Sequence, residues 1–200
     1  VVGLPGNDIR SDVTYSIEEV CSKYNLSADT PYVLVLQHSV SHTYADAAMQ
    51  IDETLQAVTT LKYPVLLANP NDDAGGRVIL TKMQEYSDRY SNIQILPLLS
   101  SRELFASIMS HSGVLLGNSS AGVVEAMSLG LPVVNIGDRQ SGREHLACMI
   151  NVEYDRLAIS NAIEMALNDK KYRLELEDFT RNMVWLDTPV EVVNCLLDID

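Results

Sequence analysis

Two serines and one carboxylate stand out in a stretch of mostly apolar residues. Ser119 and Ser120 follow the apolar run Val114–Leu116 and the turn Gly117-Asn118, at the point where we expect a helix to begin. A helix start offers unpaired backbone N–H groups, side-chain hydroxyls and the positive end of the helix dipole, a combination that binds anions. The sequence therefore predicts that this turn and both serines bind a phosphate group. The alternative is that the two hydroxyls only cap the helix, as serines commonly do.

Glu125 is the only charged residue of that predicted helix. Its neighbours Val123, Val124, Ala126 and Met127 are apolar. A carboxylate on a largely buried helix needs a partner, because an unpaired buried charge is costly. The two hydroxyls of a ribose would supply that partner, unless this face of the helix reaches solvent. Together with the serines, Glu125 indicates a phosphorylated ligand that carries a ribose.

His38 and Arg139 also follow predicted strands. His38 ends an apolar, β-branched run, where a titratable ring would face the ligand. Arg139 lies in a loop with two glycines, and its guanidinium suits a phosphate or a carboxylate. Both are candidates for the same site. A lone histidine is nevertheless more often an ordinary polar residue. Ser141-x-x-Glu144 in the same loop is a helix-capping pattern, so Arg143 fits a structural role better than Arg139 does.

Short apolar runs alternate with helical segments along the chain. The runs that predict strands are Tyr32–Gln37, Val65–Ala68, Ile93–Leu96, Val114–Leu116 and Val133–Ile136. The segments that predict helices are 44–62, a stretch after the loop at 69–76 that ends near 90, 100–109 (capped by Ser100-x-x-Glu103), 120–129, 159–168, 171–183 and 189–197. This alternation predicts an α/β fold with a Rossmann-like parallel sheet flanked by helices. Ligands bind at the carboxyl ends of the strands in such sheets, so the candidate residues should share one edge.

The composition narrows the classes of protein further. The chain has 200 residues, 46% of them hydrophobic, and a net charge of −13. This indicates a globular domain and argues against sequence-independent binding to nucleic acid. No apolar run approaches the roughly 20 residues that cross a membrane, so we expect no membrane partner. We expect residues 1–14 to be a loop or linker from a preceding N-terminal domain, and residues 15–200 to be a nucleotide-binding domain. His42, His111 and His145 lack the arrangement of metal ligands, so we expect no metal site.

Four motifs resemble one known enzyme family. They are 37–40 (QHSV), 69–75 (NPNDDAG), 117–125 (GNSSAGVVE) and 137–144 (GDRQSGRE). Together they are similar to the C-terminal half of UDP-N-acetylglucosamine 2-epimerases, above all the hydrolysing type, over about residues 1–200. The resemblance implies one half of the two-domain glycosyltransferase-B (GT-B) fold, with the active site between two Rossmann-like domains.

The resemblance also implies roles for the candidate residues. Ser119 and Ser120 match serines that bind the diphosphate, and Glu125 matches the glutamate that holds the uridine ribose. His38 matches a catalytic histidine near the diphosphate and the reacting sugar, and Arg139 matches an arginine of the same cleft. The implied reaction converts UDP-N-acetylglucosamine and water into N-acetylmannosamine and UDP through 2-acetamidoglucal, for sialic acid or related nonulosonic acid biosynthesis. It implies a cytoplasmic enzyme without a cofactor, a homo-oligomer when full length. The family's proton-transferring acids lie in the N-terminal half, so we expect this chain alone to be inactive and to bind UDP weakly at most.

The motif at His38 departs from part of the family. Non-hydrolysing relatives have His-Arg-Arg-Glu-Asn where this chain has His38-Ser39-Val40-Ser41-His42, which favours the hydrolysing branch. Hydrolysing relatives often have proline in place of Ser39, which leaves the sugar open, including a modified one such as UDP-diacetylbacillosamine. Two other functions stay open: a GT-B glycosyltransferase that uses a sugar nucleotide, and a non-enzymatic module that senses UDP-sugars.

Overall fold

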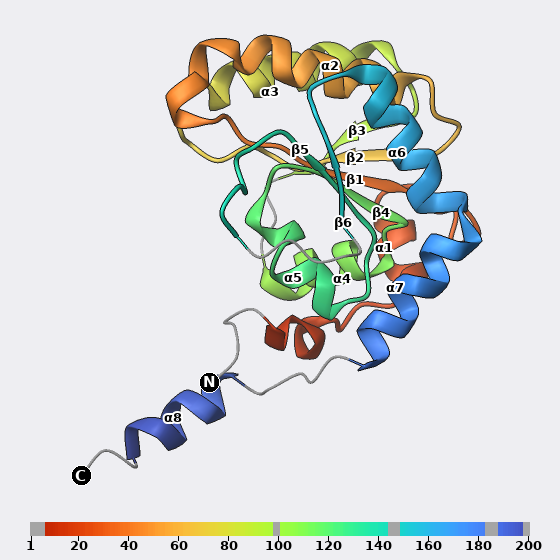
Figure 1. Cartoon of the computed structure of the whole chain (residues 1–200). Helices are drawn as coiled ribbons and strands as arrows, with labels where there is room; N and C mark the ends of the chain where they lie inside the picture. Colours follow the sequence, from red (N-terminus) through yellow and green to blue (C-terminus); the bar gives the residue numbers. More distant parts are fainter. Residues whose placement is uncertain (1–6, 98–100, 144–148, 183–187, 198–200) are drawn as a thin grey trace.

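The computed structural model describes residues 7–97, 101–143, 149–182 and 188–197. Six parallel strands form one sheet in the order β3-β2-β1-β4-β5-β6 (Figure 1). The strands are β1 (Val33–Leu36), β2 (Val65–Leu67), β3 (Ile93–Ile95), β4 (Val114–Gly117), β5 (Val133–Ile136) and β6 (Met149–Val152). The parallel sheet and its flanking helices confirm the predicted α/β class.

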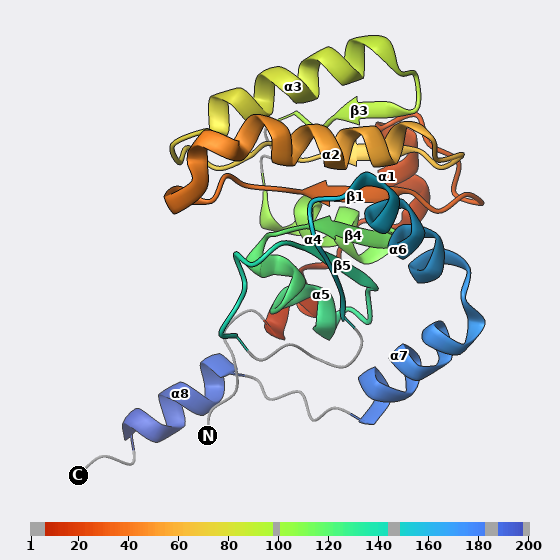
Figure 2. The same cartoon turned by 45° about the horizontal axis from the view of Figure 1, so that its top comes forward.

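Helices cover both faces of the sheet. The α-helices are α1 (Ile17–Lys23), α2 (Ala47–Thr59), α3 (Gly76–Arg89), α4 (Arg102–His111), α5 (Glu125–Ser128), α6 (Arg156–Asn168), α7 (Lys170–Asn182) and α8 (Thr188–Leu197), with 3-10 helices η1 (Asn7–Asp12), η2 (Ser41–Asp46) and η3 (Ser120–Gly122). Figure 2 shows α2, α3 and α6 on one side of the sheet and α4 and α5 on the other. Alternate residues of each strand enter the two layers: Val33 and Val35 pack under α2, α3 and α6, whereas Leu34 and Leu36 pack with α1, α4 and η1.

The order of the strands reverses between β1 and β4. From β1 the chain builds outward to β2 and β3, then returns to place β4 on the other side of β1. Leu36 of β1 is in register with Gly117 of β4. The residues that follow these two strands therefore emerge side by side at the carboxyl edge, where open α/β sheets bind ligands.

Two predicted elements differ from the structure. The helix expected over 120–129 is broken into η3 and the single turn α5, because Gly122 has low helix propensity and Val123 and Val124 are β-branched. The dipole argument for an anion site here is correspondingly weaker. The strand β6 was not predicted: it lies at the edge of the sheet, and only Met149 of its four residues is buried.

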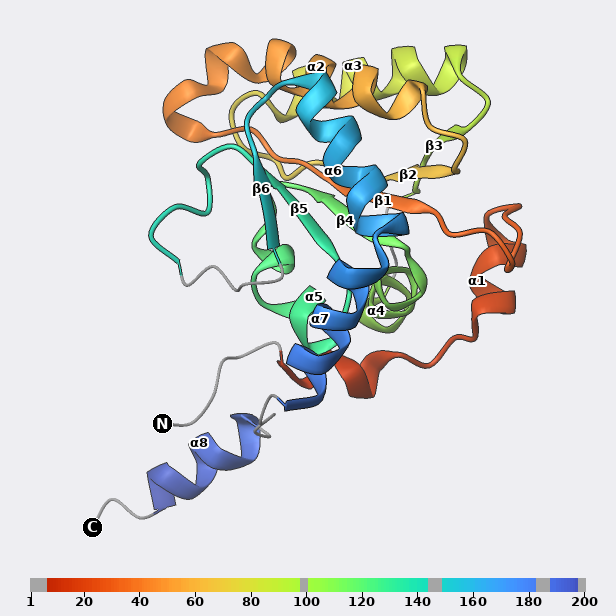
Figure 3. The same cartoon turned by 45° about the vertical axis from the view of Figure 1, so that its right-hand side comes forward.

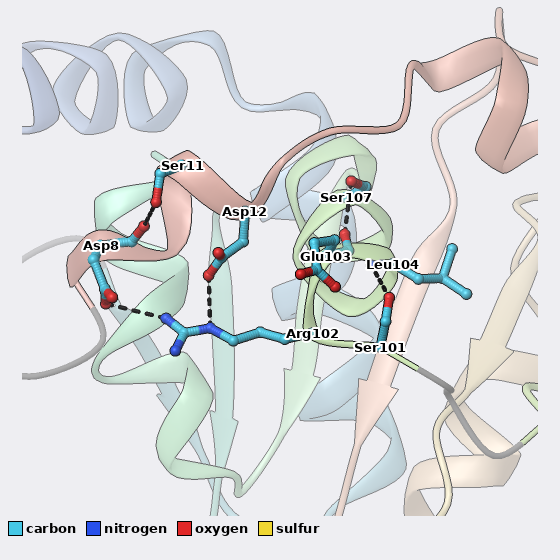
Figure 4. Close-up of polar contacts among 8 residues, drawn as sticks. All are labelled: Asp8, Ser11, Asp12, Ser101, Arg102, Glu103, Leu104 and Ser107. Atoms are coloured by element: carbon cyan, nitrogen blue, oxygen red, sulfur yellow. Dashed lines mark hydrogen bonds and ion pairs between the residues drawn. The ribbon is translucent and has the colours of Figure 1, made fainter.

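The start of α4 also lies one residue later than predicted. Ser101 caps the helix by accepting a hydrogen bond from the Leu104 amide at 3.2 Å, so the predicted cap at Ser100, which lies outside the described residues, is wrong. The next residue, Arg102, binds Asp8 at 3.1 Å and Asp12 at 2.6 Å (Figure 4). These ion pairs fasten η1 to α4.

The segment η1 also contacts α5, the helix that begins at Glu125. Ile9 of η1 is buried in the core beside α4 and α5, and the Arg10 side chain donates a hydrogen bond to the Ser128 carbonyl at the end of α5. At the other end of the chain, α8 lies apart from the sheet and its covering helices in all three views (Figure 3). Among the described residues, no helix is long and apolar enough to span a membrane.

Candidate functional site

Asn118 joins the ends of β1 and β4. Its Oδ1 accepts a hydrogen bond from the His38 amide at 2.8 Å, and its Nδ2 donates to the His38 carbonyl, also at 2.8 Å. The Asn118 side chain is fully buried. It therefore completes the backbone hydrogen bonds of His38 as a neighbouring strand would, and it fixes the position from which the His38 ring projects.

Gly117 permits this close approach. Its φ is +139°, and a Cβ at this position would lie 2.1 Å from the Leu36 carbonyl oxygen. A side chain here would push β4 away from the end of β1, so only glycine brings Asn118 against His38.

Arg139 and Gln140 come to the same asparagine from the loop after β5. Arg139 Nη1 donates to the Asn118 carbonyl at 3.2 Å, and Gln140 Nε2 donates to it at 2.7 Å. The structure thus brings together His38, Asn118 and Arg139, which are 101 positions apart in sequence at the extremes. Gln140 was not among the predicted site residues, because nothing in the sequence distinguishes it from the rest of a polar loop.

The His38 ring is held in one tautomer. Nδ1 lies 3.1 Å from the Asn71 backbone nitrogen, and because that amide can only donate, Nδ1 is the acceptor and the ring proton is on Nε2. Burial lowers the pKa of His38, the Arg139 guanidinium lowers it further, and Asp73 opposes the change. The ring is therefore neutral at pH 7 and offers one donor, Nε2–H, toward the carboxyl edge.

The two serines differ in their environment. Ser119 Oγ accepts a hydrogen bond from the Ala121 amide at 3.3 Å and caps η3. Within the described ranges the Ser120 hydroxyl has no hydrogen-bond partner, and its side chain is half-buried. Ser120 is thus an available donor beside Asn118, while Ser119 combines a capping role with its place at the edge.

Glu125 is half-buried at the start of α5. Its Oε2 is buried and has no hydrogen-bond partner among the described residues. Burial raises the pKa of Glu125, whereas a hydrogen bond from its own backbone amide and the Arg102 and Arg143 cations act in the opposite direction. Arg102 itself forms ion pairs with Asp8 and Asp12 (Figure 4). The carboxylate therefore has an acceptor oxygen that hydroxyl donors of a ligand would satisfy.

Tyr154 is a residue of this site that the sequence did not reveal. It follows β6, and its hydroxyl accepts a hydrogen bond from Asn118 Nδ2 at 3.2 Å. The strand that precedes it was not predicted, so nothing marked Tyr154 as a residue of the carboxyl edge.

The described residues contain no group of three or more His, Cys, Asp or Glu side chains that could hold a metal ion. His145 lies outside the described residues.

Comparison with known protein families gives a match over most of the chain. The sequence model of the family described as UDP-N-acetylglucosamine 2-epimerase matches residues 1–184. A curated protein from Legionella pneumophila, UDP-N,N'-diacetylbacillosamine 2-epimerase (hydrolyzing), is 33% identical over 86% of this chain and 45% of its own length. The chain spans less than half the length of the curated relatives it matches.

Solved structures share the fold at low sequence identity. UDP-GlcNAc 2-epimerase from Neisseria meningitidis, bound to UDP-GlcNAc, has a TM-score of 0.69 at 14% identity, covering 96% of this chain and 53% of that one. WaaG, a glycosyltransferase involved in lipopolysaccharide biosynthesis, has a TM-score of 0.59 at 11% identity, covering 98% and 54%. These likenesses confirm the expected Rossmann-like half of a GT-B fold.

Proposed function

Because the chain belongs to the UDP-N-acetylglucosamine 2-epimerase family, we propose that it is the UDP-binding domain of a hydrolysing epimerase. The proposed reaction converts UDP-N-acetylglucosamine and water into N-acetylmannosamine and UDP, in sialic acid or related nonulosonic acid biosynthesis. The observation that carries the proposal is the cluster around Asn118, which gathers His38 and Arg139 where the strand order reverses. The name of the Legionella relative supports the hydrolysing type and makes a diacetylated sugar the nearest alternative substrate.

The proposed roles follow from the donors and acceptors at the edge of the sheet. The ribose hydroxyls donate to Glu125, whose buried Oε2 lacks a partner among the described residues. Ser119, Ser120 and Arg139 bind the diphosphate together with the backbone of the turn Gly117-Asn118. His38 Nε2–H lies on the same edge and suits an oxygen that gains negative charge.

This arrangement supports a role in the departure of UDP. In the proposed first step the C1–O bond breaks, its electron pair goes to the diphosphate oxygen, and the C2 proton passes to a base. The products are UDP and 2-acetamidoglucal; water then adds across the C1–C2 double bond with inverted configuration at C2. A neutral His38 would donate a hydrogen bond to the departing oxygen. Following the family resemblance, we assign the base to the other half of the protein and the reaction to the cytoplasm, with no cofactor and with a homo-oligomeric enzyme.

Product analysis tests the reaction. The protein that joins this chain to its N-terminal half is incubated with UDP-N-acetylglucosamine or the diacetylated analogue, without an acceptor. We expect free UDP and a sugar inverted at C2. UDP release that depends on an acceptor would instead identify a glycosyltransferase, the function that the likeness to WaaG keeps as the second candidate. Binding of UDP-sugar without turnover would indicate a sensing module.

A binding experiment tests the site. We expect Glu125→Gln to weaken UDP binding by about tenfold, because two ribose hydroxyls lose an ionised acceptor, worth about 1.5 kcal/mol. Calorimetry or NMR titration of the chain measures this loss, and inorganic pyrophosphate, which has no ribose, serves as the control ligand. Equal UDP affinity of the wild type and the variant would contradict the ribose assignment.

A further inference from the structure

Tyr154 lies against the loops that carry the candidate site. It comes two residues after the end of β6, and its ring covers Gly137 at the end of β5. A Cβ at Gly137 would lie 2.5 Å from the ring and 3.0 Å from the hydroxyl oxygen. The glycine, with a φ of +69°, therefore lets the phenol reach the centre of the carboxyl edge.

The hydrogen bonds of Asn118 determine which way the phenol proton points. His38 offers a backbone N–H on one side and a carbonyl on the other, so Asn118 Oδ1 must face the first and Nδ2 the second. The remaining N–H of Nδ2 is then directed at the Tyr154 hydroxyl, 3.2 Å away. The phenol oxygen is the acceptor of this bond, and within the part of the chain that the structure describes its own O–H has no acceptor.

We infer that the Tyr154 hydroxyl donates a hydrogen bond to a phosphate oxygen of the bound diphosphate. The inference rests on the proposed function, because it assigns a further donor to the same nucleotide site. Three features support it: the phenol contacts the residue between Gly117 and Ser119, its donor has no acceptor among the described residues, and Arg139 donates to the backbone carbonyl of the same asparagine. Burial raises the pKa of Tyr154, so the phenol keeps its proton at neutral pH and remains a donor.

The test compares Tyr154→Phe with the wild-type chain. Phenylalanine keeps the ring over Gly137 and removes only the hydroxyl. The matched control is Tyr86→Phe, which removes a hydroxyl that donates to Asp52 at 3.0 Å, between α3 and α2 and outside the site. UDP, inorganic pyrophosphate and uridine are each titrated into the three proteins, followed by NMR so that weak binding is measured.

We expect Tyr154→Phe to bind UDP and pyrophosphate about tenfold more weakly, as for a hydrogen bond to a charged group. Uridine has no phosphate, so its affinity should not change, and Tyr86→Phe should match the wild type with all three ligands. Unchanged affinity of Tyr154→Phe for UDP and pyrophosphate would overturn the inference, and so would an equal loss of affinity for uridine, which would show a packing effect. If neither the wild-type chain nor the protein that joins it to its N-terminal half bound UDP or pyrophosphate, the proposed function itself would be contradicted.

Discussion

At the scale of single residues, Glu125 lowers the stability of the free protein at a position where the proposed ligand would bind. Its carboxyl is half-buried at the start of α5, with one oxygen that has no partner in the described ranges. An unsatisfied buried acceptor lowers stability, by about 1–3 kcal/mol when burial is complete. The protein keeps this cost at a position where nucleotide hydroxyls would remove it.

We therefore expect Glu125→Gln to raise the free energy of unfolding by about 1 kcal/mol at pH 7, because the amide carries no charge into the half-buried position. The value is at the low end because burial is incomplete. The pKa of Glu125 is raised by burial, so the wild type holds its proton more tightly folded than unfolded. The protonated carboxyl costs the folded protein little at low pH. Stability is lost as the carboxyl ionises, when the pH rises through the folded pKa. Urea unfolding at pH 4 and pH 7 checks this: the variant's advantage should be small at pH 4 and larger at pH 7. A constant difference would contradict the assignment to the Glu125 charge.

At the scale of elements, the contact between β1 and β4 depends on one glycine. Gly117 has a positive φ and no room for a Cβ, whereas Gly142, with a φ of +85°, has nothing within 4 Å. A substitution at Gly142 therefore tests backbone strain alone, whereas a substitution at Gly117 adds a steric clash to that strain.

We expect Gly117→Ala to lower the free energy of unfolding by about 3 kcal/mol or more, and Gly142→Ala by about 1–2 kcal/mol from strain alone. Urea unfolding of both variants measures the difference. Gly117→Ala should also weaken UDP binding, since it moves Asn118 away from His38. Similar losses of stability for the two variants would show that crowding against Leu36 is not important.

The sequence predicted the buried elements more readily than the exposed ones. Strands β1, β2 and β4 are uninterrupted apolar runs in the buried sheet, as in Val65–Leu67, and β3 and β5 were anticipated although Gln94 and Asn135 interrupt them. Edge strand β6 has Asn151 exposed, and α1 is a short helix with only two buried residues, Val20 and Cys21, so neither gave a clear period. In the site, His38 and Arg139 could be placed at one edge from topology alone. Tyr154 could not, because its position depends on a strand that was missed and on contacts far apart in sequence.

At the scale of the whole molecule, α8 is separate from the body that carries the site (Figure 3). Its side chains Val193, Leu196 and Leu197 are 53%, 64% and 75% exposed. Helix α7 differs, because Tyr172 and Leu176 are buried against the rest of the fold.

Removing the chain from residue 188 onward should therefore change the unfolding temperature by no more than about 2 °C, because these α8 side chains are exposed and bury little apolar surface. The longer deletion, of residues 170–200, also removes two buried side chains of α7. It should lower the unfolding temperature by several degrees or more. Calorimetric melting of the two truncated chains compares them. A large loss from the shorter deletion would show that α8 stabilises the body of the domain.

The group that Arg139 binds is neutral, so the guanidinium keeps its positive charge. Arg139 donates to the Asn118 carbonyl, and none of the ion pairs among the described residues includes it. A carbonyl orients a guanidinium without cancelling its charge, whereas a carboxylate would do both. In a chain of net charge −13, whose distant charges are screened over about 8 Å, Arg139 thus contributes a positive charge to this edge that no described carboxylate pairs with. On the proposed function, this unpaired charge is what would draw an anionic ligand to an acidic protein.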